Sequence, residues 1–248
     1  MKHCLSIFLL VTLLLAGCAP AATPQPTATP IPPTATPSMQ DFVGKLHWFG
    51  TSAFLYRGSR VIYFDPVALS GTLPPADLIL VTHAHSDHWS VADIQKIIGP
   101  KTVLVISPNV SASYQVDKAL LNIPVTTLSE GQTTEVNGIS IQAVPAYGAG
   151  HPREAGGMGF IVAVDGVRMY MSGGTDAYPE MAQYASDIAF IPAYSRAQAE
   201  ALVKVIPAKT IIIEHTSYYA AKALGDLFTQ GVGAGKTFVA LESGPLAP

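Results

Sequence analysis

The sequence predicts an α/β (α+β) fold, a four-layer αββα sandwich in which two β-sheets face each other and helices cover their outer surfaces. Two observations support this prediction. Short apolar, β-rich runs occur in two series, and each series passes into a stretch where predicted strands and helices alternate. The globular part, residues 40–248, is also of the right size for one domain with a large core.

The first series opens the globular part. Its predicted strands are Lys45–Phe49, Ser52–Tyr56, Arg60–Phe64 and Asp77–Val81. Ser90 is suited to cap a short helix over Val91–Ile98, which ends before Gly99-Pro100. A strand over Thr102–Ile106 and a helix over Ser111–Leu121 complete this half.

The second series repeats this outline without a residue-level repeat. Its predicted strands are Val125–Leu128, Thr133–Val136, Ile139–Val144, Phe160–Val164 and Val167–Met171. Asn137-Gly138 and Asp165-Gly166 are turn dipeptides between them. The remaining segments alternate between helix and strand: Pro179–Ala185, Asp187–Ile191, Ala197–Val205, Lys209–Ile213, Tyr218–Gln230 and Thr237–Leu241.

Residues 1–18 have the features of a secretory signal peptide. Lys2 and His3 form a positive start, and the apolar run Leu5–Ala16 is far shorter than the roughly 20 residues of a membrane-spanning helix. The run ends in Leu15-Ala16-Gly17-Cys18, which resembles the lipobox of bacterial lipoproteins. Cys18 is therefore expected to become the first mature residue and to carry lipid. The alternative is an ordinary secretory signal that is cut nearby, with Cys18 incidental.

Residues 19–39 are rich in Ala, Thr and Pro, a composition that cannot form a core. They predict a semi-rigid tether with a reach of up to roughly 60 Å, at about 3.1 Å per residue. The expected location is therefore extracytoplasmic, with the domain lipid-anchored to the bacterial cell membrane. The two cysteines of the chain, Cys4 and Cys18, both precede this linker, which excludes thiolate ligands and cysteine nucleophiles from the domain.

The formal net charge is −3 at pH 7, and no basic run is interleaved with aromatic residues. Nucleic acid is therefore not expected as a partner. The chemistry-bearing residues lie elsewhere, in the segment Val81-Thr82-His83-Ala84-His85-Ser86-Asp87-His88. Three imidazoles and one carboxylate at the mouth of a buried strand have the composition of a divalent metal site. The alternative interpretation is a polar surface loop that happens to be rich in histidine.

Two more histidines, His151 and His215, also follow predicted strands. In α/β folds ligand sites collect at such strand ends. Each of the two would be an ordinary surface or strand-end residue if it stood alone, and their placement alongside the cluster is what makes them candidates. His47, inside the first strand, is expected to be a packed or surface residue.

The segment His83-x-His85-x-Asp87-His88 resembles the signature of the metallo-β-lactamase fold superfamily, and the resemblance covers about residues 45–241. It is also carried by His47-Trp48-Phe49-Gly50 with Asp65-Pro66, by Val144–Tyr147 with His151-Pro152 and Gly157–Phe160, and by Ile211–His215. The branch that the chain most resembles is that of the ascorbate-6-phosphate lactonase-like metallohydrolases. The signature implies the αββα fold and says little about the substrate.

The resemblance also implies a ligand set. His83, His85 and His151 would hold a first metal, and the second would be held by Asp87, His88 and His215. Zn²⁺ is the default for imidazole and carboxylate ligands, with Mn²⁺ or Fe as alternatives and one or two ions bound. A metal-bound hydroxide would be the nucleophile, and Asp87 would be the catalytic residue that orients it or moves its proton.

The chain departs from the family pattern at Gly174, in Gly173-Gly174-Thr175, where the family has an aspartate that bridges both metals. Asp176 is the nearest carboxylate, and the sequence leaves open whether it reaches the metals. The chain would then bind two metals weakly, bind one, or keep the fold without the reaction. Thr51 is a second departure, at a position near the site where many relatives have histidine.

The resemblance implies a membrane-tethered, metal-dependent hydrolase of a small ester, lactone or phosphoester. The alternative, motivated by Gly174, is a non-catalytic lipoprotein that uses the fold as a binding module. Several aromatic side chains are candidates for lining a substrate pocket, although half-buried packing is the more ordinary role of a tyrosine: Tyr147, Tyr194, Tyr218 and Tyr219. Arg153 and Lys222 are candidates for meeting an anionic substrate, with solvated positions as the alternative.

Overall fold

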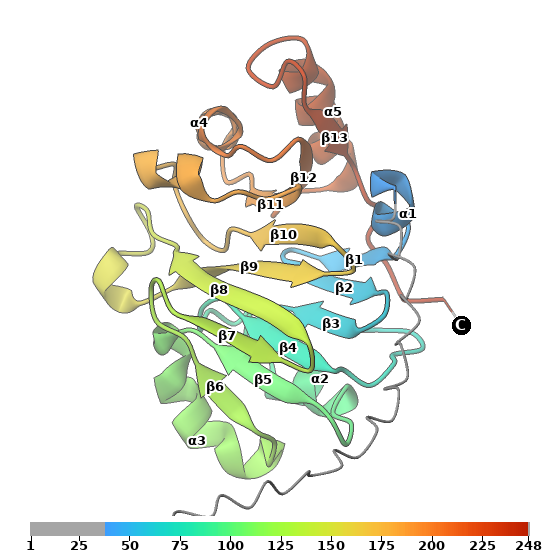
Figure 1. Cartoon of the computed structure of the whole chain (residues 1–248), viewed down its shortest axis with the longest axis vertical. Helices are drawn as coiled ribbons and strands as arrows, with labels where there is room; N and C mark the ends of the chain where they lie inside the picture. Colours follow the sequence, from blue (N-terminus) through green and yellow to red (C-terminus); the bar gives the residue numbers. More distant parts are fainter. Residues whose placement is uncertain (1–37, 248) are drawn as a thin grey trace, which may run out of the picture. The chain divides into compact units, whose positions relative to one another are not determined.

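The computed structural model describes residues 38–247, and two mixed β-sheets form its centre (Figure 1). The predicted signal peptide, Cys18 and all but the end of the predicted linker lie outside the described residues. The described part begins with a short helix that the sequence analysis did not predict, α1 (Met39–Val43), capped by Ser38, whose Oγ accepts a hydrogen bond from the N–H of Asp41. The buried Phe42 docks this helix on the core.

The first sheet has the strand order β1-β2-β3-β4-β5-β6. Its strands are β1 (Leu46–Gly50), β2 (Ala53–Arg57), β3 (Val61–Phe64), β4 (Leu78–Val81), β5 (Val103–Ile106) and β6 (Val125–Thr127). The first three pair antiparallel, and β3 to β6 pair parallel. The helices α2 (Val91–Lys96) and α3 (Ser111–Leu121) belong to the parallel half, and a short 3₁₀ turn, η1 (Pro108–Val110), precedes α3.

The second sheet has the order β13-β12-β11-β10-β9-β8-β7. Its strands are β7 (Thr133–Val136), β8 (Ile139–Pro145), β9 (Met158–Val164), β10 (Val167–Met171), β11 (Ile188–Pro192), β12 (Thr210–Glu214) and β13 (Thr237–Val239). It too is antiparallel first, from β7 to β10, and parallel from β10 to β13. Its helical segments are η2 (Arg153–Ala155), η3 (Pro179–Gln183), α4 (Arg196–Val205) and α5 (Tyr218–Thr229).

Alternation along the strands separates the layers. In β4, Leu78 and Leu80 face the space between the sheets, whereas Ile79 and Val81 pack under the α2 and α3 helices. In β12, Ile212 faces the same space between the sheets, and Ile211 and Ile213 pack against α4 and α5. Three buried apolar clusters therefore lie between four layers, which confirms the predicted αββα sandwich.

The observed elements match the predicted ones to within a few residues, with small differences at the ends. The helix predicted over 179–185 is the 3₁₀ segment η3, and β9 begins two residues before the predicted strand Phe160–Val164. None of the helices in residues 38–247 combines the length and the apolar character needed to cross a membrane. The loops that follow β1, β3, β4, β8, β10 and β12 are the ones that carry the candidate site residues.

Candidate metal centre

The turn after β4 carries the histidine cluster and is held in shape by the backbone. The N–H groups of His88 and Trp89 both donate to the carbonyl of His85, and Asn109 Oδ1 accepts a hydrogen bond of 2.7 Å from the N–H of Ala84. The turn allows His83 and His88 to point inward, where they are 3% and 1% exposed, while His85 stays exposed. The clustering predicted from the sequence therefore rests on a fixed loop.

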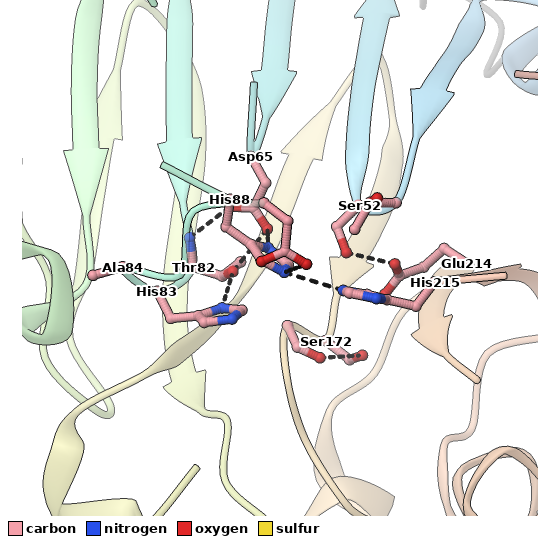
Figure 2. Close-up of polar contacts among 12 residues, drawn as sticks. Ser52, Asp65, Thr82, His83, Ala84, His88, Ser172, Glu214 and His215 are labelled. Carbon is pink, nitrogen blue, oxygen red and sulfur yellow. Dashed lines mark hydrogen bonds and ion pairs between the residues drawn. The ribbon is translucent and has the colours of Figure 1, made fainter. Parts of the chain in front are cut away.

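Asp65 is the anchor of this loop. It follows β3 with a positive φ of 42° and is fully buried. Its carboxylate accepts hydrogen bonds of 2.7 Å from the N–H and Oγ1 of Thr82, and it lies 2.7 Å from Nδ1 of His88 (Figure 2). Because Nδ1 is engaged, Nε2 of His88 is the nitrogen left to bind a ligand.

The six residues that the sequence analysis named as metal ligands form two groups in the structure. His83, His85 and His151 make one group, and Asp87, His88 and His215 make the other. Within each group, one ligand atom per residue lies within 4.8 Å of every other. The loop after β4 supplies four of the six, and the second sheet supplies the other two from the loops after β8 and β12.

Two distances test whether these groups suit a metal ion. Nε2 of His88 lies 3.1 Å from Nε2 of His215 and 3.8 Å from Oδ2 of Asp87. Two nitrogens bound to one tetrahedral Zn²⁺ at about 2.0–2.1 Å would lie about 3.3 Å apart. Figure 2 shows the imidazoles of His88 and His215 meeting between the two sheets. The donor atoms of the second group therefore fit a divalent ion.

Lowered pKa values of three of the imidazoles also favour metal binding, because a ligand nitrogen must be free of its proton. Burial, followed by the neighbouring His88, lowers the pKa of His83 to about 2 and that of His215 to about 4. Burial and then His85 lower the pKa of His151. At His88 burial is outweighed by Asp65, then by Glu214 and Asp87, and its pKa is raised.

The space beside Gly174 is filled by His151. A Cβ atom at position 174 would lie 2.8 Å from Nε2 and 2.9 Å from Cε1 of the His151 imidazole. Asp176, the nearest carboxylate in the sequence, joins neither ligand group. Its Oδ2 accepts a hydrogen bond of 3.0 Å from the N–H of Ala149, and so it stabilises the loop that carries His151. Asp176 therefore lies outside both donor groups and supports the loop that carries His151.

Thr51, the second position where the chain departs from the family pattern, supports His215 through its backbone carbonyl. Its carbonyl accepts hydrogen bonds from the N–H of His215, at 3.3 Å, and from Nε1 of Trp48, at 2.9 Å. His215 and Thr51 both have positive φ, 58° and 47°. The remaining histidine, His47, hydrogen bonds through Nε2 to the carbonyl of Gly244 and belongs to neither group.

Two residues that the sequence analysis did not single out, Glu214 and Ser52, lie beside the second group. Glu214 is fully buried, and the Oγ of Ser52 donates to its Oε2 (Figure 2). Burial raises the pKa of Glu214 to about 8, with Ser52 and His88 acting in the opposite direction. A sequence signal was present, because Glu214 alternates with Ile212 and so points toward the space between the sheets.

A cavity of about 380 Å³ opens next to the first group. It is lined by His151, Asp176 and Tyr194, by Thr175, Ser195 and Gln198, and by the backbone of 148–150. Tyr194 also lies with its ring 4.9 Å from that of His215. Of the four tyrosines named from the sequence it alone lines this cavity.

The other side chains proposed for a pocket have different partners. Tyr147 stacks on Tyr178 at 4.5 Å, and Tyr218 packs against Tyr219, which is 81% exposed. Arg153 forms an ion pair with Glu130, and Lys222 pairs with Asp226 at 2.8 Å on the surface of α5. Neither basic residue lines the cavity beside His151.

Comparisons with known proteins agree with this arrangement. Residues 45–215 match the family described as "Beta-lactamase superfamily domain". A UPF0173 metal-dependent hydrolase of Thermococcus kodakarensis is 31% identical over 223 residues, which cover 81% of this chain and 97% of that protein. One from Methanoculleus marisnigri is 32% identical over 160 residues, 60% of this chain and 67% of the relative. A crystal structure from Parabacteroides distasonis superposes with a TM-score of 0.67 at 26% identity, covering 80% and 93% of the two chains.

Proposed function

Because the chain belongs to the β-lactamase superfamily, among the UPF0173 metal-dependent hydrolases, we propose that it is a metal-dependent hydrolase of a small ester, lactone or phosphoester. One observation carries the proposal: two adjacent groups of imidazole and carboxylate donors, contributed by both sheets, have the spacing that divalent ions need. Zn²⁺ is the ion that these donors suit best, with Mn²⁺ or Fe as alternatives.

When bound, such ions polarise the scissile group of the substrate and lower the pKa of an attacking water. The residues of the chain orient the metal ligands and accept the proton. Asp65 holds the imidazole of His88 by a 2.7 Å contact with Nδ1, so that Nε2 faces the second group. Asp87 has a half-exposed side chain at the same group and is placed to accept a proton from the attacking water.

The cavity beside His151 supports a preference among the three substrate classes. Asp176 is its one charged carboxylate, and no lysine or arginine lines it. A phosphate group is usually met by basic side chains, whereas an uncharged ester or lactone needs none. We therefore favour an uncharged ester or lactone over a phosphoester.

Metal analysis of the purified full chain tests the proposal. After supplementation with Zn²⁺, Mn²⁺ or Fe²⁺ the protein should hold one to two equivalents and hydrolyse members of an ester and lactone panel, and a chelator should abolish turnover. His215→Ala should lose about one equivalent. His47→Ala is the matched control, because its imidazole belongs to neither group. Less than about half an equivalent in the wild type would contradict the proposal.

A second candidate function is supported by Gly174. The glycine removes the carboxylate that bridges the metals in the family pattern, so the chain is a candidate for a binding module that kept the fold without turnover. The two proposals predict the same metal content and differ in catalysis. A fully loaded protein that is inert toward esters, lactones and phosphodiesters would favour the binding module.

We further propose that lipid on Cys18 tethers the domain to the bacterial membrane, on its extracytoplasmic side. The lipobox-like segment Leu15–Cys18 and the proline-rich stretch that follows it support this. Expressed with its own leader, the wild type should sediment with membranes and incorporate labelled fatty acid. Cys18→Ser should remove the label. A wild type that takes up no label would refute the lipid anchor.

A further inference from the structure

The carboxylate of Glu214 occupies an unusual position at the end of β12. Along this strand Ile211 and Ile213 pack outward under the helices, and Ile212 faces the opposite sheet. Glu214 shares the inward orientation of Ile212 and lies fully buried beside Ser52 and His215 (Figure 2). The strand thus delivers a carboxylate to the space between the sheets, next to the second ligand group.

Within residues 38–247 the Glu214 carboxylate has no cationic partner. No lysine or arginine of the described chain forms an ion pair with it, and its Oε1 is buried without a hydrogen-bond partner. Ser52 Oγ serves only Oε2. A buried carboxyl group that leaves one oxygen without a hydrogen-bond partner is costly to the fold, so a merely structural role would be better filled by an apolar side chain.

The ligand groups themselves contain a single carboxylate. The first group consists of three imidazoles, and the second contributes Asp87 alone. Asp65 adds one charge through its contact with His88, and Gly174 adds none. Two divalent cations would bring four positive charges to a site that holds the two carboxylates Asp65 and Asp87, and Glu214 adds a third carboxylate whose charge acts on Asp87 and His88.

We propose that Glu214, held by Ser52, supplies the negative charge that Gly174 leaves out and so stabilises the ion bound by Asp87, His88 and His215. It is a positioning residue that acts on the ion through its field, since its oxygens lie outside the ligand group. The proposal rests on the metal-dependent function above. It assigns the compensating charge to the carboxyl end of β12 instead of that of β10, two strands that run in the same direction in one sheet.

Zinc titration of the metal-free full chain tests this role. Glu214→Gln removes the charge but keeps a side chain of the same shape that can bond to Ser52. We expect its affinity for the second equivalent of Zn²⁺ to fall about 10- to 100-fold, as for other residues that support metal ligands, with the first equivalent unchanged. Glu214→Asp, which keeps the charge, should lose less than about tenfold.

Two controls separate this role from a structural one. Glu135→Gln makes the same change at an exposed position of β7 in the same sheet and should leave both affinities unchanged. The melting temperature of metal-free Glu214→Gln should stay within a few degrees of the wild type, because the amide keeps the shape of the side chain and an oxygen that accepts from Ser52. Unchanged zinc affinity of Glu214→Gln would overturn the proposal at any melting temperature, and a wild type without zinc would refute the metal-dependent function itself.

Discussion

Position 174 shows how one missing side chain changes its surroundings. The φ of Gly174 lies outside the left-handed region, so the backbone would accept any residue. The constraint comes from His151, whose imidazole stands 2.8 Å from the place of a Cβ atom. The imidazole of His151 can therefore take this position only because residue 174 has no side chain. An aspartate at position 174 would require His151 to move.

Gly174→Ala is expected to disturb the first ligand group without unfolding the protein. The added methyl group must displace the His151 ring, which sits on a half-exposed loop that can give way. We expect at least a tenfold loss of zinc affinity at one site by chelator competition, with a change in unfolding free energy below about 1 kcal/mol. Gly244→Ala, whose Cβ would meet no atom within 4 Å, is the control. Unchanged affinity would show that the ring position in the structure is not the one that binds metal.

Sequence reasoning found the six histidine and aspartate residues of the two donor groups because they stand in a dense cluster or follow apolar strands. It did not find Glu214, which looked like the polar end of a strand, and it offered Asp176 because that carboxylate is near in sequence. Distance along the chain does not measure distance in space. The partner that a strand-end side chain meets depends on how the two sheets stack, and that is a property of the whole core.

Among the elements, the β9–β10 turn has an unexpected structural role. Asp165 in this turn accepts hydrogen bonds from the hydroxyl of Tyr56, at 2.5 Å, and from the N–H of Ser59, at 2.9 Å, and also from the Ser59 hydroxyl. Tyr56 and Ser59 belong to the β2–β3 hairpin of the other sheet. A turn predicted only from its Asp-Gly dipeptide thus joins the two sheets.

Asp165→Ala should destabilise the domain by about 1–3 kcal/mol, because three donors lose their acceptor. Burial opposes ionisation of Asp165, but the bonds from Ser59 and Tyr56 outweigh it and hold the pKa of the carboxyl below its ordinary value of 3.8. The advantage of the wild type should therefore be complete above about pH 4 and disappear as the pH falls through the lowered pKa.

Urea unfolding of both proteins at pH 7 and at pH 2.5 measures this difference. Asp226→Ala, which breaks only an exposed pair with Lys222 on α5, should leave the unfolding free energy unchanged within error. An Asp165→Ala effect that is the same at both pH values would mean that ionisation of this carboxyl does not contribute.

The elements themselves were predictable where local chemistry decides them. Runs of β-branched and aromatic residues form the strands, and serine caps begin α2, α4 and α5, as in Ser217, whose Oγ accepts from the N–H of Ala220. Helix α1 is not predicted because five residues carry too little periodicity, and its first residue, Met39, lies at the end of the predicted linker. Its stability comes from Phe42 in the inter-sheet core, a contact that local sequence does not reveal.

For the whole molecule, each ligand group takes residues from both sheets. An ion in either group would therefore resist separation of the two layers and bind only the folded chain. At a free zinc concentration 100 times the dissociation constant, one site adds about 2.7 kcal/mol. For a domain of this size that corresponds to a rise in melting temperature of about 5–10 °C.

Differential scanning calorimetry of the metal-free and the zinc-loaded chain measures this rise. The double variant His83→Ala, His215→Ala, which removes one ligand from each group, should show no response to zinc. A wild type whose melting temperature does not change on loading would indicate that the groups bind zinc weakly or that they form equally well in the unfolded chain.

The boundary between the two halves of the chain has a consequence for how this protein can be divided. The exposed turn at 129–132 separates β6 from β7, and therefore the six-stranded sheet from the seven-stranded one. A cut there would leave His83, His85, Asp87 and His88 on one fragment and His151, Glu214 and His215 on the other. Neither fragment would then carry a complete donor group, because each group takes residues from both fragments. A bound zinc ion would connect the two fragments, and their association would depend on zinc.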